Sequence, residues 1–253
     1  MALSFGNTER AFAHKSDADL SKAYRLFQSF SYPFLVNYGP VIANWAMKIG
    51  LPIKPVIKNT IFNQFCGGET IEESNQFAKK LFNQQIGAIL DYSVEGEGTE
   101  ENFVRTFEEL KSVIGEAADK PEYPFAVFKS TGIGSFSVLT AKSAGQNLTP
   151  NQQIQYDQLV DRIHSLCKYA HQNKVKLLID AEESWIQDTV DEIVYTNAKA
   201  FNCNEIIVFN TIQLYRKGMV EKIEKQINIA RESGYKIGFK LVRGAYMEKE
   251  SER

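Results

Sequence analysis

The hydrophobic pattern of the chain changes character near residue 86. Before that point apolar residues recur at helical spacing, as at Leu20, Ala23, Leu26 and Phe27, and this pattern predicts helices. Prolines are expected to cut the region into short helices, at Pro33, Pro40, Pro52 and Pro55. We therefore predict an N-terminal helical region over residues 1–85 that packs on the domain following it.

From residue 86 onward, short apolar runs alternate with long amphipathic segments. The runs have strand length and β-forming composition, and they cover residues 86–92, 125–131, 175–182, 205–213 and 235–245. Between them, Thr149 and Pro150 suit the start of a helix, and a second helix over 218–233 is expected to stop at Gly234. Strands that alternate with helices predict a parallel sheet.

The polar residues at the strand ends separate two kinds of parallel sheet. Chemistry-bearing residues follow successive predicted strands, at Lys129, Asp180, Gln213, Lys240 and Arg243. This distribution is typical of a TIM barrel, whereas a doubly wound sheet concentrates its site at one switch point beside a glycine fingerprint. Residues 131–134 (TGIG) lack the third glycine of that fingerprint. The predicted fold is an α/β, TIM-type (β/α)8 barrel over residues 86–253, of which only about the first five βα units are present, so a C-terminal truncation is expected.

Composition removes several classes of function. The chain has 253 residues, 43% of them hydrophobic, with a formal net charge of −2, which argues against a disordered chain and against general nucleic-acid binding. The scattered cysteines, Cys66, Cys167 and Cys203, are interpreted as reduced packing residues. The histidines, His14, His164 and His171, form no HExxH motif, so no metal site is expected.

The apolar stretch over residues 30–47 is the one early candidate for membrane contact. It is interrupted by prolines and asparagines and is too short for a transmembrane helix, and the N-terminus does not resemble a signal peptide. Its aromatic residues could touch a membrane surface, although packing on the main domain is the favoured interpretation.

Two predicted strand ends carry charged residues that are costly to bury. Lys129 is interpreted either as a fixed cation for a substrate anion or as a lysine whose charge reaches solvent. Asp180 is favoured as a site residue, with a helix-capping role as the alternative. Glu182 and Glu183, which follow it, are expected to be surface or capping residues.

The later strand ends add hydrogen-bonding groups. Asn210, Thr211 and Gln213 suit a heterocycle with both donors and acceptors, or else a polar loop. The segment 240–246 (KLVRGAY) combines two basic residues, a glycine and a tyrosine, which suits a planar cofactor that carries phosphate.

Six segments together resemble the proline dehydrogenase family of flavin-dependent barrel enzymes. They occur in the family's order and are FCGGET (65–70), AILDYSVEG (88–96), FAVFKST (125–131), LLIDAEE (177–183), FNTIQLY (209–215) and KLVRGAY (240–246). The likeness runs from about residue 55 to the end of the chain. It implies an FAD-dependent oxidation of L-proline to 1-pyrroline-5-carboxylate, the first step of proline degradation.

The resemblance also implies site residues. Asp180 and Lys240 match catalytic positions, although many bacterial members have arginine at the second, so its role stays open. Lys129, Leu241 and Tyr246 match substrate-binding positions. The positions that match FAD-binding residues are Ala181, Gln213, Val242, Arg243, Gly244 and Ala245.

Further expectations follow from the family. Electrons are expected to pass to a membrane quinone, so a cytoplasmic protein with possible peripheral contact to the inner face of the membrane is predicted. The family's paired arginines and its later FAD contacts would follow Arg253, so these 253 residues alone are expected to have little activity. Two alternatives stay open: a Schiff-base lyase with Lys129 as nucleophile, and a non-catalytic barrel acting as a binding or assembly module. The choice between proline and hydroxyproline also stays open.

Overall fold

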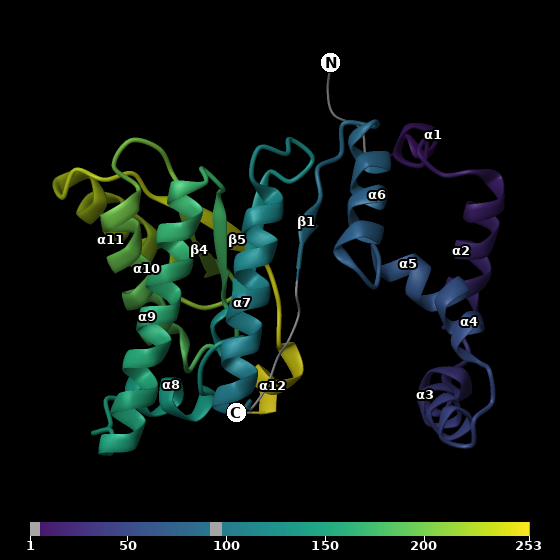
Figure 1. The fold of residues 1–253 in the computed structure, drawn as a ribbon, viewed down its shortest axis with the longest axis horizontal. Helices are drawn as coiled ribbons and strands as arrows, with labels where there is room; N and C mark the ends of the chain where they lie inside the picture. The colour runs from purple at the N-terminus through teal and green to yellow at the C-terminus, as the bar shows by residue number, and fades with distance from the viewer. Residues whose placement is uncertain (1–5, 92–97, 253) are drawn as a thin grey trace. The chain divides into compact units, whose positions relative to one another are not determined.

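The computed structural model describes residues 6–91 and 98–252, and the chain divides into two compact units (Figure 1). The first unit is Met1–Ile86 and the second is Gly87–Arg253. Each unit is described by itself below.

The first unit consists of helices. They are α1 (Thr8–Ala11), α2 (Asp17–Ser29), α3 (Pro33–Lys48), α4 (Lys54–Ile57), the π-helical η1 (Lys58–Phe62), α5 (Asn63–Phe65) and α6 (Ile71–Phe82). Ser16 caps α2 in a reciprocal capping box with Asp19, and Thr70 caps α6. No helix of the described residues is long and apolar enough to cross a membrane.

Pro40 does not cut this region as predicted. It lies inside α3, whereas Pro33 occupies the first turn of that helix, where proline is tolerated. An internal proline removes one backbone hydrogen bond, and the 16-residue helix continues on both sides of it. Prolines therefore mark the start of α3 correctly but not its end.

The second unit contains a parallel sheet whose five strands follow one another in sequence order. The strands are β1 (Ile89–Leu90), β2 (Phe125–Lys129), β3 (Leu177–Asp180), β4 (Val208–Gln213) and β5 (Gly238–Val242). All five predicted strands are confirmed, although each is shorter than its apolar run; Tyr92, in the first run, lies outside the described residues. The sequential order is that of a TIM-type barrel, because a doubly wound sheet reverses its order at a switch point.

Helices connect the strands and lie together on one side of the sheet, as right-handed crossovers in one direction require (Figure 1). They are α7 (Glu100–Ala117), α8 (Phe136–Ser143), α9 (Pro150–Gln172), α10 (Gln187–Phe201) and α11 (Met219–Glu232). The short η2 (Ser130–Gly132) directly follows β2, and α12 (Met247–Glu252) follows β5. Thr149 caps α9 in a capping box, and Gly234, at φ +73°, follows α11, as the sequence predicts. The opposite side of the sheet is left for the side chains that form the candidate site.

The core of the second unit lies between the sheet and these helices. Its fully buried side chains include Ile163 and Leu166 on α9 and Leu177 and Ile179 on β3. Cys167 is also buried there, which agrees with its predicted packing role, but Cys66 and Cys203 are exposed, so that prediction is wrong for two of the three cysteines.

Candidate active site

A row of polar side chains crosses four neighbouring strands near their carboxyl ends. In the register of the sheet Lys129 lies beside Asp180, and Thr211 lies beside Lys240. The Lys240 ammonium donates to Oδ1 of Asp180 at 2.5 Å, and the Thr211 hydroxyl lies 3.5 Å from the same oxygen. We call these four residues the charged row. The structure thus brings together three of the predicted site residues, from β2, β3 and β5.

A second row lies two residues further along the same strands. Gln213 projects on the same side of β4 as Thr211, because side chains alternate between the faces of a strand, and Thr131 and Glu182 follow the ends of β2 and β3. The backbone N–H of Thr131 donates to Oε1 of Glu182 at 3.1 Å, and its hydroxyl donates to Oε2. The Gln213 amide donates to the carbonyl oxygen of Glu182. These three residues, the end row, tie the ends of β2, β3 and β4 together.

Glu182 and Glu183 are buried, so their predicted place at the surface is wrong. They are 3% and 5% exposed, respectively. The prediction failed because it counted them as part of the loop after β3, whereas each has a specific donor: Thr131 for Glu182, and the Lys249 ammonium, 2.6 Å from Oε1, for Glu183. Helix α10 starts at Gln187 with no side-chain cap, so neither carboxylate, nor Asp180, caps it.

Burial raises the pKa of Glu182 to about 7, because a low-dielectric environment disfavours the charged carboxylate. The hydrogen bonds from Thr131 and the charge of Lys129 oppose this shift, and the negative charge of Glu183 adds to it. Glu182 is therefore a carboxyl group that changes its protonation state near neutral pH, next to the charged row.

Gln213 has most of its hydrogen-bonding capacity used within the protein. It is 2% exposed, and its Nε2 donates both to the carbonyl of Glu182 and to the Tyr215 hydroxyl, the latter at 2.8 Å. Arg216 donates to its Oε1 at 3.2 Å. The amide is thus held in one orientation. A ligand could still donate a hydrogen bond to the free lone pair of Oε1.

The predicted site residues at the end of β5 are divided between two faces of the strand. Val242 shares the face of Lys240, whereas Leu241 alternates to the opposite face, where it is 58% exposed. Arg243 and Gly244 are exposed, and the Arg243 guanidinium has no ion pair or hydrogen bond with any part of the chain that the structure describes.

Two further predicted positions flank the rows. Ala181 is buried directly after Asp180, and Ala245 is half-buried after Gly244. Tyr246 has φ +57°, a left-handed conformation that is uncommon for residues other than glycine, and the Lys249 ammonium lies 5.4 Å from its ring centroid.

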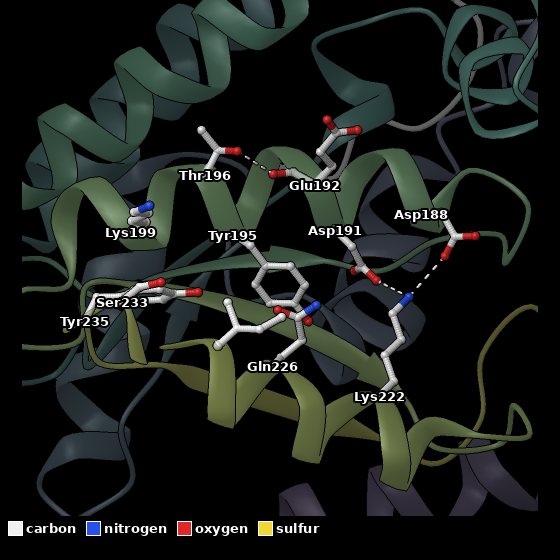
Figure 2. Close-up of a pocket in the computed structure, with 11 residues that line it drawn as sticks. Asp188, Asp191, Glu192, Tyr195, Thr196, Lys199, Lys222, Gln226, Ser233 and Tyr235 are labelled. Atoms are coloured by element: carbon white, nitrogen blue, oxygen red, sulfur yellow. Dashed lines mark hydrogen bonds and ion pairs between the residues drawn. The ribbon is translucent and has the colours of Figure 1, made fainter. Parts of the chain in front are cut away.

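Asn210 faces away from the two rows, into the helix layer. Its Nδ2 donates to Oδ1 of Asp191 on α10 at 2.8 Å, and Gln187 donates to the same oxygen at 2.7 Å. Asp191 also lines a cavity of about 450 Å³ between α10 and α11, where Lys222 bridges it to Asp188 at 2.6 and 3.0 Å (Figure 2). Burial lowers the pKa of Lys222, but the two carboxylates raise it by more, so this pKa lies above its ordinary value. The sequence interpretation of Asn210 as a heterocycle-binding residue therefore does not agree with its position, since it serves this buried network.

Sequence reasoning missed Thr131, Glu182 and Glu183 as parts of the site. Thr131 and Glu182 lie two residues beyond Lys129 and Asp180 and within the predicted strand runs 125–131 and 175–182, so the period of a strand would have placed them on the same face. The charged and end rows stand at the carboxyl ends of sequential parallel strands, which is where TIM-type barrel enzymes carry their active sites. Fold and site together define this class of protein.

Comparison with known proteins identifies the family within this class. The model of the proline dehydrogenase family matches residues 75–253, and the chain belongs to this family. It is 30% identical over 291 residues to mitochondrial proline dehydrogenase 1 of Dictyostelium discoideum, an alignment that covers 98% of this chain and 50% of that protein. It is 32% identical over 186 residues to the carbapenem antibiotics biosynthesis protein CarD of Pectobacterium carotovorum, covering 74% of this chain and 50% of the other. The chain thus spans about half the length of these relatives.

Solved structures agree with the fold. Proline utilization A from Bdellovibrio bacteriovorus inactivated by N-propargylglycine superposes with a TM-score of 0.65 at 16% identity, covering 99% of this chain and 28% of that one. The D779Y mutant of proline utilization A from Bradyrhizobium japonicum has a TM-score of 0.55 at 23% identity, covering 73% and 18%. At these identities the likeness supports the barrel-type fold alone.

Proposed function

We propose that this protein oxidises L-proline to 1-pyrroline-5-carboxylate with FAD as its cofactor. The observation that carries the proposal is the charged row: a paired Asp180 and Lys240, with Lys129 beside them in the register, at the strand ends of a chain that belongs to the proline dehydrogenase family. A row with charges of both signs suits an amino-acid substrate, which carries a carboxylate and an amine.

The donor set of the site fits a flavin nucleotide. Gln213 offers an oriented amide, Lys240 a cation, and Arg243 an exposed guanidinium without a partner in the described residues, beside a glycine that allows close backbone approach to a phosphate. FAD, when bound, would accept the hydride of the oxidation and, with it, both electrons.

The chain's own residues would bind and orient the substrate. Lys129 would hold the proline carboxylate, and Tyr246 would contact the ring. Asp180 would keep Lys240 in place through the 2.5 Å contact and balance its charge. In the reaction the ring C–N bond becomes C=N: a carbon-bound hydrogen leaves as hydride and the nitrogen-bound proton passes to solvent.

The electron acceptor and the location belong to the same proposal. We propose a membrane quinone as the acceptor of the flavin's electrons, and a cytoplasmic protein that contacts the membrane peripherally. The apolar and aromatic residues of α3 are one candidate surface for this contact.

The test uses the protein at the full length that its gene encodes, supplied with FAD. Flavin absorbance is recorded first, followed by reduction of a dye by L-proline. We expect flavin bands, proline-dependent bleaching, and a loss of at least about 100-fold in turnover for Asp180→Ala. Asp161→Ala, an exposed aspartate on α9, is the matched control and should keep full activity.

The remaining outcomes would each contradict the proposal. Faster dye reduction with hydroxyproline than with L-proline would show that hydroxyproline is the preferred substrate. Borohydride trapping of a carbonyl compound on Lys129 would favour a Schiff-base enzyme. A protein that neither binds flavin nor responds to proline would favour a non-catalytic barrel.

A further inference from the structure

Helix α12, which follows β5, is bound to the loop after β3 by hydrogen bonds and an ion pair. Glu250, on α12, accepts two hydrogen bonds from Ser184: Oε1 from its backbone N–H at 2.6 Å and Oε2 from its hydroxyl at 2.7 Å. Next to it the Lys249 ammonium lies 2.6 Å from Oε1 of the buried Glu183. We call these two contacts the clasp. It joins segments that are 66 residues apart in sequence.

The clasp lies close to the end row. Ser184 is two residues from Glu182, whose carboxylate and carbonyl hold Thr131 and Gln213. The Tyr215 hydroxyl, which accepts a hydrogen bond from Gln213, has its pKa raised by burial and further by the charges of Glu250 and Glu183. The negative charges of the two clasp carboxylates therefore act on the Tyr215 hydroxyl, just after the end of β4.

The clasp also fixes the position of Tyr246, the residue before α12. This residue, at φ +57°, is the last before α12, and its carbonyl accepts the backbone N–H of Glu250 at 2.9 Å. A left-handed conformation at a tyrosine persists only where its surroundings hold it, and such outliers concentrate at ligand sites. The first turn of α12 supplies that support, and Glu250 anchors the turn to Ser184.

We infer that Glu250 is a positioning residue: by binding Ser184 it fixes α12, and thereby the place of Tyr246 at the strand-end site, so that it governs affinity for the amino-acid substrate. This inference rests on the proposed function. It assigns Glu250 no contact with substrate or flavin, and hence no part in the chemical step.

The first arm of the test needs no activity. The chain has two tryptophans, and Trp185 follows Ser184 directly, so Trp45→Phe leaves one fluorophore at the clasp. In that background Glu250→Ala should raise acrylamide quenching of Trp185 at least about twofold, whereas Ser184→Ala, which loses only the hydroxyl bond and keeps the backbone N–H bond, should raise it less. Glu250→Gln, which keeps an acceptor for the N–H, should restore most of the protection. Glu252→Ala, an exposed glutamate on the same helix, is the matched control.

The second arm measures kinetics in the full-length protein. Glu250→Ala should raise KM for L-proline about tenfold, with kcat and flavin binding unchanged, because two charge-assisted hydrogen bonds are lost away from the reacting atoms. Glu250→Gln should recover a KM near the original value.

Three results would overturn the inference. They are unchanged quenching in Glu250→Ala, a fall in kcat at constant KM, and equal effects of Glu250→Ala and Glu252→Ala. If the unaltered protein does not turn over L-proline, the proposed function fails and with it the role in substrate affinity, while the quenching arm still decides whether Glu250 holds the loop.

Discussion

At the scale of single residues, the alternation of side chains along a strand decides which groups meet. Lys129, Asp180 and Lys240 are close because parallel strands place equivalent positions side by side. The sequence was sufficient to place these three, since each lies at or near the carboxyl end of a predicted strand. It was not sufficient for Glu182, because burial of a carboxylate depends on a donor, Thr131, that lies 51 residues away in sequence.

The raised pKa of Glu182 predicts a pH-dependent stability. In the folded state the group keeps its proton up to a pH of about 7, whereas the unfolded value is near 4.5. The folded state therefore binds more protons between these values, and stability falls as pH rises from about 4.5 to about 7. At about 1.4 kcal/mol per pKa unit, the full loss is about 3 kcal/mol.

Glu182→Gln removes this titration while an amide can still bond to Thr131. We expect urea unfolding of the variant to vary less between pH 5 and pH 8 than that of the unaltered chain, and the variant to be the more stable of the two at pH 8. The exposed substitution Glu252→Gln serves as the control. Parallel pH profiles for Glu182→Gln and the original chain would refute this assignment.

The Asp180–Lys240 pair predicts an asymmetry between single and double substitutions. The two side chains are 16% and 35% exposed, so Lys240→Met leaves a largely buried carboxylate without its cation and should cost about 1–3 kcal/mol of unfolding free energy. The double variant Asp180→Asn with Lys240→Met should recover part of that loss. A double-mutant cycle in urea measures the coupling, and additive effects would show that the contact contributes nothing to stability.

At the scale of elements, boundaries were harder to predict than identities. All five strands and the helices α9 and α11 were predicted, because turn residues such as Gly234 and the Thr149–Pro150 pair mark their ends. Pro40 shows the limit of that reasoning, since α3 passes through it. Asn210 shows another: it alternates with Thr211 along β4, so it faces Asp191 on α10 and not the site.

The capping box of α9 provides a prediction for one element. Thr149 accepts the N–H of Gln152, and the Gln152 side chain accepts the N–H of Thr149. Thr149→Ala should lower the unfolding free energy of the chain by about 1 kcal/mol, and Thr149→Ser should leave it nearly unchanged. Equal stabilities of the alanine and serine variants in chemical denaturation would refute the role of the cap.

At the scale of the whole molecule, the sheet of the described residues has two edges. β5 pairs with β4 alone, and its Leu241 is 58% exposed. Exposed apolar edge strands promote association between chains. Leu241→Lys should therefore reduce self-association of the 253-residue chain in sedimentation measured over a concentration series, whereas Leu241→Met should not. A chain that is already monomeric at the highest concentration would contradict this expectation.

The ion pair between Asp180 and Lys240 has a consequence for folding kinetics. Its partners are 60 residues apart, and the Thr131–Glu182 and Ser184–Glu250 contacts close loops of similar length. Contacts at such separations form slowly because the chain between them must first be ordered. The site should consequently be among the last parts of the second unit to form, after α9 and β3 have built the core beneath it, so that a nascent chain buries its apolar residues before its charged ones find their partners.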